Sequence, residues 1–447
     1  MKSTLVEDWV ALMLPEASYS KSMEKISGVA IDSRLVQPGD LFFALSGNTT
    51  DGHCFLRNAA KAGAVAAVVS KKYRGESFGL ELIRVEDPKC ALKEAGHSQY
   101  NLFQGNVIGI AGSLGKTTTK EFSKIFLSST YKVFSSPKSY NSQLTVPLSL
   151  LMADGDEDFI LLEMGVSEPG NMQNLLSIVQ PDIVVMTHIA DQHTKNFPSG
   201  VQGILEEKSL ILNNSRLQLL PKDSLWYDHL RSKSSLADIF SFSFHDQSAD
   251  FCYKAIDSQT VTIQTPDEDI HLPIALSYKP AYVNLLIAVS LAWLLKVSIE
   301  NLIYSLPSLQ LPPMRFEQSI RNGIHIINDA YNACPEAMLA ALDALPNPSE
   351  EGRIILILGH MSELGAYSDE GHAIVAMKAL SKANMIFFVG EKWSLIQHTL
   401  KDQPCQTSFY SSVHDIEPIL KNIVKQGDVV FLKGSRCLAL ESLLVCF

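Results

Sequence analysis

The sequence predicts an α/β protein of three domains. Its 447 residues exceed the length at which one hydrophobic core keeps growing, so the chain should divide. Short strand-like apolar runs alternate with helical stretches, which is typical of parallel sheets with crossover helices. A glycine-rich loop, residues 111–119, follows one such run and precedes a helix, and this indicates a nucleotide-binding architecture in the middle of the chain.

Composition excludes several classes of protein. A hydrophobic content of 46% with 19% charged residues is ample for buried cores and argues against disorder. The longest apolar runs are far shorter than the ~20 residues that span a bilayer, so we expect no membrane insertion. The formal charge of -11 disfavours general nucleic-acid binding but leaves room for a local pocket that binds one nucleotide. We therefore expect small-molecule partners. A monomer is also expected.

The start of the chain and its cysteines indicate the compartment. Acidic Glu7 and Asp8 stand among the first apolar residues, and no basic start leads into a small-residue cleavage site, so the cytoplasm is expected. The seven cysteines show no paired metal spacing, which predicts neither a disulfide framework nor a zinc site. They are expected to be reduced thiols in the core.

The three predicted domains span residues 1–100, 101–310 and 311–447. A polar segment, residues 213–269, is expected to be an insertion with short strands, and it precedes an apolar helix over residues 282–295. The proline-rich stretch 306–313 marks the second boundary. The predicted strands are 28–31, 40–45 and 64–69 in the first domain, 107–110, 159–164 and 183–186 in the second, and 324–328, 353–358, 385–389 and 429–432 in the third.

The glycine-rich loop has the features of a phosphate loop. Glycines let backbone amides converge on phosphate oxygens, and the following helix adds its positive N-terminal end. Lys116 would neutralise phosphate charge and Thr117 would ligate magnesium, so the predicted cofactors are ATP and Mg²⁺. In the common phosphate loop the first glycine lies six residues before the lysine. Here that position is Ile110, and Gly112 lies four residues before Lys116. The residues assigned to ATP are Gly112, Ser113, Leu114, Gly115, Lys116, Thr117 and Thr118.

A nucleotide-gated switch or binding protein is the alternative that this loop leaves open, because regulatory GTPases share it. A GTPase would need an Asn-Lys-x-Asp guanine reader, and the chain contains no Asn-Lys pair. The sequence therefore favours an enzyme.

The loop Gly-x-x-Gly-Lys-Thr-Thr, with Glu163 ending a later strand and His193 beyond the next, resembles the Mur ligase family. The similarity continues at residues 31–34, 40–45 and 51–55 and in two later stretches, Asp-Ala-Tyr-Asn-Ala-Cys-Pro at 329–335 and Leu-Gly-His-Met-Ser-Glu-Leu-Gly at 358–365. The two later stretches resemble the family member that uses a dipeptide amine. Another Mur ligase, or an amide ligase similar to folylpolyglutamate synthetase, is the alternative within this class.

The resemblance implies a fold and a reaction. It implies a small UDP-substrate-binding α/β domain, a central parallel-sheet P-loop ATPase domain and a C-terminal Rossmann-like α/β domain. ATP would phosphorylate the terminal carboxylate of UDP-N-acetylmuramoyl-tripeptide, and the amine of D-alanyl-D-alanine would attack the acyl phosphate. Phosphoryl transfer between two anions demands charge neutralisation, here by Lys116 and metal ions.

The resemblance also assigns roles to residues. Taken alone, Lys208 beside two glutamates would be a solvated helix face, and His193 an ordinary histidine. Matched to the family, the catalytic residues are Lys116, Lys208 and His193, and the metal ligands are Thr117, Glu163, His193 and Lys208 as a carbamate. Further nucleotide contacts are Asn284, Arg315, Asp329 and Tyr331, and the UDP-substrate contacts are Ser33, Arg34 and Asn141.

Four positions depart from the family pattern. They are Ser142 in an Asn-Asn-x-x-Gly-x-Pro stretch, His188 at a usual asparagine, Met314 at a usual glycine and His360 at a usual aspartate. None of them changes Lys116, Glu163 or Lys208.

Overall fold

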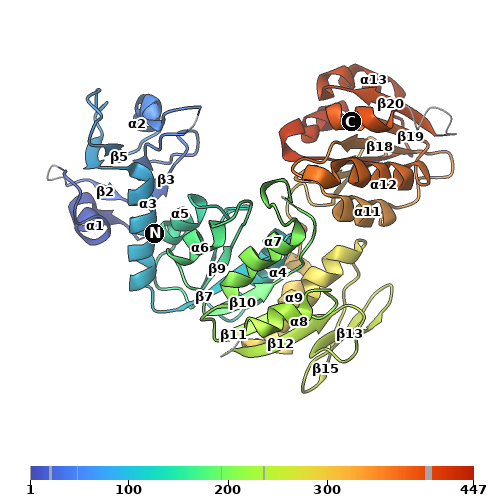
Figure 1. The fold of residues 1–447 in the computed structure, drawn as a ribbon, viewed down its shortest axis with the longest axis horizontal. Helices are drawn as coiled ribbons and strands as arrows, with labels where there is room; N and C mark the ends of the chain where they lie inside the picture. Colours follow the sequence, from blue (N-terminus) through green and yellow to red (C-terminus); the bar gives the residue numbers. More distant parts are fainter. Residues whose placement is uncertain (1, 20–22, 48, 193, 235–236, 398–404) are drawn as a thin grey trace.

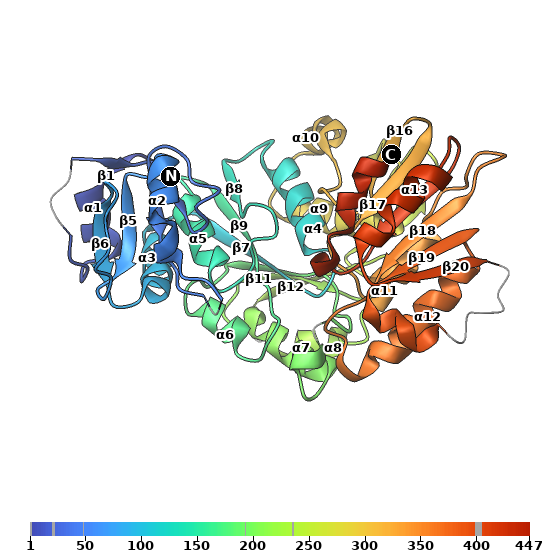
Figure 2. The same ribbon diagram turned by 90° about the horizontal axis from the view of Figure 1, so that it is seen from above.

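Three large β-sheets, one in each domain, organise the chain in the computed structural model (Figure 1). The structure describes residues 2–19, 23–47, 49–192, 194–234, 237–397 and 405–447. The N-terminal and C-terminal domains lie at opposite ends, with the central domain between them, and the view from above shows the same order (Figure 2). The predicted fold class, α/β with three domains, is confirmed.

The N-terminal domain is built on a four-stranded parallel sheet in the order β3-β4-β5-β6. A two-stranded antiparallel pair, β1 and β2, lies beside helix α1. The elements are β1 Thr4–Leu5, α1 Val6–Met13, β2 Lys25–Ile26, β3 Gly28–Ala30, β4 Asp40–Phe43, α2 Leu56–Lys61, β5 Ala66–Ser70, β6 Glu81–Val85 and α3 Pro88–Leu102.

The central domain has a nine-stranded sheet in the order β15-β14-β13-β12-β11-β10-β7-β9-β8. The strands from β13 to β8 run parallel, and β14 and β15 are antiparallel. The elements are β7 Asn106–Ala111, α4 Lys116–Leu127, β8 Val133–Ser135, α5 Thr145–Met152, β9 Phe159–Glu163, α6 Asn171–Leu176, β10 Ile183–Met186, α7 Val201–Ser209, β11 Leu217–Pro221, α8 Tyr227–Ser232, β12 Asp238–Ser243, β13 Phe251–Ile256, β14 Val261–Gln264, β15 Asp269–Leu272, α9 Lys279–Leu294 and α10 Ile299–Ser305.

The central sheet is covered on both faces, so its strands are apolar throughout. Ile108 and Ile110 of β7 pack with α4 and α9, whereas Val107 and Ala111 pack on the opposite face with α5 and α7. Helix α9 is apolar nearly all round because it is buried against both the sheet and the neighbouring helix α4.

The polar segment 213–269 forms short strands within the central domain, as predicted, but it is not an insertion into that domain's sheet. Its five strands, β11 to β15, extend the central sheet from β10 outward. Parallel pairing of β10 with β11 and of β11 with β12 continues the doubly covered sheet. The sequence suggested an insertion because the segment is polar, while sheet pairing is not visible in composition.

The order of strands places a topological switch beside β7. After β7 the chain forms β8 and β9 on one side of it, then crosses to β10 on the other. In open parallel sheets, ligands bind at such a point, outside the carboxyl ends of the strands. The phosphate loop after β7, Glu163 at the end of β9 and the residues after β10 therefore meet at one edge.

Helix α3 and helix α5 join the N-terminal and central domains. The predicted boundary at residue 100 falls within α3, which packs against α5. A Cβ on Gly96 would lie 2.5 Å from Cβ of Pro147, so the close approach of the two helices requires glycine. Leu148 and Leu151 of α5 belong to the N-terminal core.

The C-terminal domain has a six-stranded sheet in the order β16-β17-β21-β18-β19-β20, in which only β16 is antiparallel. Helices α11 and α12 pack against each other, and α13 belongs to a second core cluster on the sheet. The elements are β16 Glu317–Arg321, β17 Ile324–Asp329, α11 Pro335–Asp343, β18 Ile354–Gly359, α12 Ser368–Leu380, β19 Met385–Val389, β20 Gln406–Tyr410, α13 Glu417–Ile423 and β21 Val429–Lys433.

Two expectations from composition have different outcomes. Among the described residues, no helix combines the length and apolarity needed to cross a membrane. The expectation of core cysteines holds for Cys252, Cys334 and Cys405 and is wrong for three others, because Cys54, Cys90 and Cys437 are exposed.

Candidate active site

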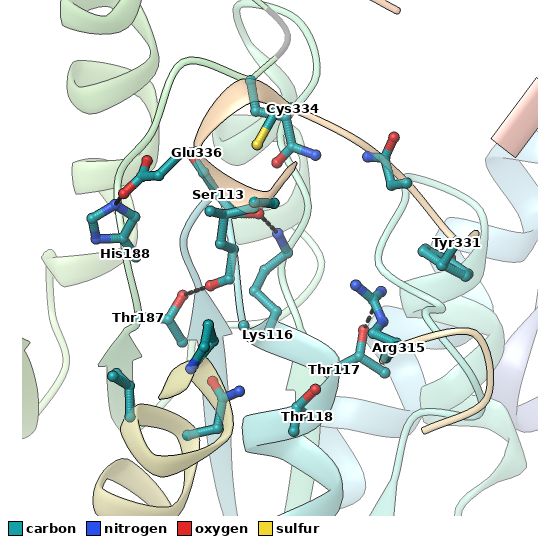
Figure 3. Close-up of a pocket in the computed structure, with 18 of the residues that line it drawn as sticks. Ser113, Lys116, Thr117, Thr118, Thr187, His188, Arg315, Tyr331, Cys334 and Glu336 are labelled. Atoms are coloured by element: carbon teal, nitrogen blue, oxygen red, sulfur yellow. Dashed lines mark hydrogen bonds and ion pairs between the residues drawn. The ribbon is translucent and has the colours of Figure 1, made fainter. Parts of the chain in front are cut away.

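A cavity of about 1310 Å³ lies between the central and C-terminal domains. The phosphate loop, the ends of β9 and β10, helix α9 and the loop after β17 all contribute to its wall (Figure 3). The fold thus brings most of the predicted residues together. Those that line the cavity are Ser113, Leu114, Gly115, Lys116, Thr117, Thr118, Asn141, Glu163, Lys208, Asn284, Arg315, Asp329 and Tyr331.

The phosphate loop connects β7 to α4 through two glycines with positive φ. Gly112 has φ +140°, and a Cβ on it would lie 2.0 Å from Oγ1 of Thr187; Gly115 has φ +84° and caps α4. Nζ of Lys116 donates to the carbonyl oxygens of Gly112 (2.8 Å) and Ser113 (3.0 Å). Burial lowers the pKa of Lys116 to about 8. A phosphate would therefore bind where three kinds of group meet. They are the amides of the loop, the N-terminus of α4 and the amine of Lys116, which can be protonated.

Arg315 brings a cation from the C-terminal domain to this loop. Its Nη2 donates to Oγ1 of Thr117 (3.0 Å) and to Oγ of Ser139 (3.3 Å), and the two hydroxyl oxygens are 2.9 Å apart. The guanidinium lies 4.1 Å from the centre of the Tyr331 ring (Figure 3). Stacking on an aromatic face fixes the plane of the guanidinium and leaves its other N–H groups for phosphate oxygens.

Glu163, at the end of β9, offers a carboxylate that fits a metal ion. Its side chain is fully buried, and Oε2 accepts a long hydrogen bond of 3.5 Å from Nδ2 of Asn141. Among the described residues, Oε1 has no hydrogen-bond donor and lies 3.5 Å from Nζ of Lys120. A buried oxygen left without a donor at the edge of a cavity is suited to a hard cation such as Mg²⁺.

Lys208 is buried, so the interpretation of a solvated helix face is wrong. It belongs to α7, is 1% exposed, and its Nζ donates to Oγ of Ser113 at 3.1 Å. Burial, and then the charge of Lys116, lower its pKa well below the usual value for lysine. An amine that is readily neutral can react with carbon dioxide. The neighbouring glutamates point elsewhere, because Glu207 accepts from the backbone N–H groups of Gly170 and Met172.

The remaining predicted nucleotide contacts are held by buried hydrogen bonds. Oδ1 of Asn284, on α9, accepts from Oγ1 of Thr119 at 3.2 Å, next to the phosphate loop. Asp329, at the end of β17, accepts from Nζ of Lys433 (2.6 Å) and from the backbone N–H of Phe316 (3.1 Å). Both side chains are therefore fixed before any ligand binds.

Ser33 and Arg34 lie in the N-terminal domain and do not line the cavity. Arg34 is exposed, and its guanidinium pairs with the carboxylate of Asp32 through Nε and Nη2. Asn141, the third residue assigned to the UDP-substrate, is in the cavity. His193 lies outside the described residues.

The four departures from the family pattern have distinct surroundings. Nε2 of His188 lies 2.6 Å from Oε1 of Glu336 across the cavity (Figure 3). Met314 adopts φ +58°, a conformation that favours the usual glycine. Ser142 hydrogen-bonds through Oγ to Thr145 at the start of α5, and Nδ1 of His360 is buried without a hydrogen-bond partner among the described residues.

Three residues of the site were missed by sequence reasoning. Ser139 bridges Thr117 and Arg315, Lys433 holds Asp329, and Lys120 pairs with Glu163. Lys120 had a signal, because it follows Lys116 by one helical turn and so shares its face. Lys433 ends β21, about a hundred residues after Asp329, and no local pattern in the sequence indicates that the two side chains pair.

Fold and site together define a three-domain P-loop protein with a nucleotide cavity between two of its domains. Comparison with known families gives matches to the Mur ligase family, catalytic domain over residues 25–100, to the Mur ligase middle domain over 110–292 and to the Mur ligase, glutamate ligase domain over 314–436. The chain belongs to the Mur ligase family.

Similar proteins extend over nearly the whole chain. A UDP-N-acetylmuramoyl-tripeptide--D-alanyl-D-alanine ligase of Bacillus subtilis is 27% identical over 98% of this chain and 96% of its own length. The MurF ligase of Thermotoga maritima in complex with ADP is 27% identical, with a TM-score of 0.74, over 94% of this chain and 96% of that one. MurF from Acinetobacter baumannii, 24% identical, shares the fold with a TM-score of 0.83 over 100% and 98% of the two chains.

Proposed function

We propose that this chain is an ATP-dependent ligase that joins D-alanyl-D-alanine to UDP-N-acetylmuramoyl-tripeptide and so forms the pentapeptide precursor of peptidoglycan. The observation that carries the proposal is the cavity, in which Lys116, Arg315, Glu163 and Lys208 surround one volume next to the phosphate loop. The similarity of the whole chain to ligases with this substrate pair supports the choice of substrates.

In the first step the γ-phosphoryl group of ATP moves to the terminal carboxylate of the tripeptide. The bond from phosphorus to the bridging oxygen of ADP breaks as a bond to the carboxylate oxygen forms. Lys116 and the loop amides would hold the phosphates, and Arg315 would meet charge that develops on the transferring group. A carboxylate is a poor electrophile, and phosphorylation converts its oxygen into a leaving group.

We propose that Thr117, Glu163, His193 and a carbamate on Lys208 would hold Mg²⁺. The fit rests on the donor-free oxygen of buried Glu163 and on the readily neutral amine of Lys208. Magnesium, when bound, supplies positive charge between the phosphates and the substrate carboxylate. Lys208 as an ammonium would repel it, whereas a carbamate offers two oxygen ligands.

In the second step the amine of D-alanyl-D-alanine attacks the acyl carbon. A C–N bond forms, the C–O bond to phosphate breaks, and the amine loses a proton as the amide is made. Closed packing of the C-terminal domain against the phosphate loop through Arg315 would exclude water that could hydrolyse the acyl phosphate.

The substrate would span two domains. Ser33 and Arg34 would hold the UDP part in the N-terminal domain, and Asn141 the peptide part at the cavity. We further propose the boundaries 1–100, 101–310 and 311–447, a monomeric state, a cytoplasmic location and no nucleic-acid partner. The formal charge of -11 supports the last point.

A coupled phosphate-release assay tests the proposal. UDP-N-acetylmuramoyl-tripeptide, ATP and Mg²⁺ should give phosphate with D-alanyl-D-alanine, and should not do so with free D-glutamate or a single diamino acid. The pentapeptide product should be detected by mass spectrometry in equal amount to the phosphate released.

The assay also separates the alternatives. ATP consumption with D-glutamate on a UDP-muramoyl-alanine acceptor, but not with the dipeptide, would make the chain another Mur ligase. Nucleotide binding without turnover on any acceptor and amine would favour a nucleotide-gated switch.

A further inference from the structure

Lys120 is a fully buried lysine that the reaction described above does not use. It lies in α4, one turn after Lys116, and its side chain is 0% exposed. Burying an ammonium away from water costs several kcal/mol unless partners compensate it. Its contacts therefore indicate what the buried charge holds in place.

Two of these contacts are with a backbone loop. Nζ of Lys120 donates to the carbonyl oxygen of Ser136 in a short hydrogen bond and to that of Lys138 at 2.5 Å. Residues 136–139 lead from β8 toward α5, and Lys138 has φ +50°, which is unfavourable for a residue with a side chain. The ammonium thus stabilises a loop that is strained at one residue.

The loop ends at a residue of the nucleotide site. Oγ of Ser139 is 2.9 Å from Oγ1 of Thr117, and both oxygens accept from Arg315 of the C-terminal domain. Because Lys120 is hydrogen-bonded to the carbonyl of the residue before Ser139, it fixes the position of this hydroxyl relative to α4.

The other contacts are with carboxylates. Nζ of Lys120 lies 3.0 Å from Oε1 of Glu121 and 3.5 Å from Oε1 of Glu163. The side chain of Glu163 is 1% exposed, so its negative charge is costly without a nearby cation. Lys120 compensates that charge, and the distance of 3.5 Å leaves the oxygen without a hydrogen-bond donor among the described residues.

We propose that Lys120 is a positioning residue that preassembles the magnesium side of the site, by fixing Glu163 and the 136–139 loop to the helix that carries Lys116 and Thr117. The inference rests on the proposed function, because the metal at Glu163 belongs to it. Lys120 itself does not line the cavity in which nucleotide and substrate would bind.

A purely structural role would have different consequences. A lysine that only stabilised the fold would, when replaced, lower the thermal midpoint and weaken nucleotide binding equally with and without metal. If Lys120 instead positions the residues that would hold the metal, its replacement should mainly reduce the gain in nucleotide affinity that Mg²⁺ gives.

The test is calorimetric titration of a non-hydrolysable ATP analogue, with saturating Mg²⁺ and with EDTA, on wild type, Lys120→Met and Lys124→Met. Methionine keeps the length and apolar stem of lysine and removes the charge. Lys124 is the matched control, because it lies one turn further along α4 and outside the cavity lining. Thermal unfolding of each variant checks the fold.

In Lys120→Met we expect metal-free affinity within about threefold of wild type, and a loss of at least roughly tenfold in the strengthening of binding by Mg²⁺. Lys124→Met should match wild type in both conditions. A folded Lys120→Met protein that keeps the full effect of Mg²⁺ would overturn the inference. If the wild type shows no effect of Mg²⁺ at all, the proposed metal site fails and the inference fails with it.

If Lys120→Met is too unstable to titrate, the double variant Lys120→Met/Glu163→Gln decides. Recovery of folding when both charges are removed would identify the unpaired Glu163 carboxylate as the cause, as the inference requires. If folding is not recovered, Lys120 does not act by compensating the charge of Glu163, and the inference is overturned.

Discussion

His188 of the central domain and Glu336 of the C-terminal domain, which both line the cavity, are in contact, with 2.6 Å between Nε2 and Oε1. Glu336 belongs to the first turn of α11, and His188 follows β10. Two further hydrogen bonds join the domains. Oγ1 of Thr194 donates to the carbonyl oxygen of Leu364, and the backbone N–H of Lys195 donates to the carbonyl oxygen of Glu363. The pair therefore belongs to the interface that closes the cavity.

Replacing Glu336 by glutamine should weaken closure without unfolding the protein. Both side chains of the pair are substantially exposed, at 41% and 54%, so the contact adds little to global stability. We expect the KM for ATP to rise about two- to fivefold, with kcat within about twofold, since closure is needed to bind nucleotide from both sides. Steady-state phosphate release measures both constants. Glu350→Gln, an exposed glutamate of the same domain, should behave as wild type.

Lys116→Ala should abolish turnover and leave the fold intact. Its Nζ folds over the phosphate loop, and removing a preorganised charge from a transferring phosphoryl group costs several kcal/mol, a loss of roughly a thousandfold or more in rate. Phosphate release and circular dichroism measure the two properties. The same replacement at Lys124, on the same helix, should be nearly silent. Turnover close to wild type in folded Lys116→Ala would refute the assignment.

Lys208→Ala should fold but lose most of its activity, and short carboxylic acids in the buffer should partly restore it. The acid would replace the carbamate oxygens in the space left by the side chain. Lys208 is buried against Ser113, and this burial lowers the pKa of Lys208 well below its usual value, which favours the neutral amine that reacts with carbon dioxide. Activity assays with and without acetate, and wild type before and after rigorous removal of carbon dioxide, check this. Unchanged activity of Lys208→Ala would exclude an essential carbamate.

His372 should make the stability of the C-terminal domain depend on pH. It is buried, its Nε2 accepts from the backbone N–H of Met361 at 3.0 Å, and its Nδ1 lies 2.6 Å from the carbonyl oxygen of Ser368. The neutral ring satisfies both contacts, and burial lowers the pKa of His372 from 6.5 to about 4. Between these values the unfolded chain binds the extra proton, so stability falls as pH falls.

Relative to high pH, the loss of stability is roughly 3 kcal/mol at pH 4, of which about 1.4 kcal/mol has appeared by pH 5.5. Well above pH 6.5 the ring is neutral in both the folded and the unfolded chain, so His372 contributes no pH dependence there. Urea unfolding at pH 7.5 and 5.5 measures the difference, and the fluorescence of Trp393, whose ring centre is 4.6 Å from that of His372, reports on this region. The free energy of unfolding of His372→Gln should lack the part of the pH dependence that His372 causes. An equal pH dependence in wild type and variant would contradict the prediction.

Local patterns in the sequence were sufficient for the strands and the phosphate loop. The strand predicted over 183–186 is β10, and that over 385–389 is β19, because buried parallel strands are continuous apolar runs with sharp ends. The phosphate loop was identified because its function depends on residues adjacent in the chain. Lys208, Arg315 and Asp329 required a family resemblance, since they lie far from the loop in sequence.

The sequence by itself therefore determined the α/β class and the nucleotide-binding loop, because periodicity and glycine positions are local properties. Only the tertiary structure decided that segment 213–269 extends the central sheet, that Lys208 is buried and that Lys120 pairs with Glu163. Strand order and burial depend on which distant segments pack together. This packing also decides which charge a lysine carries and which groups it contacts. A lysine that is not buried is solvated by water instead.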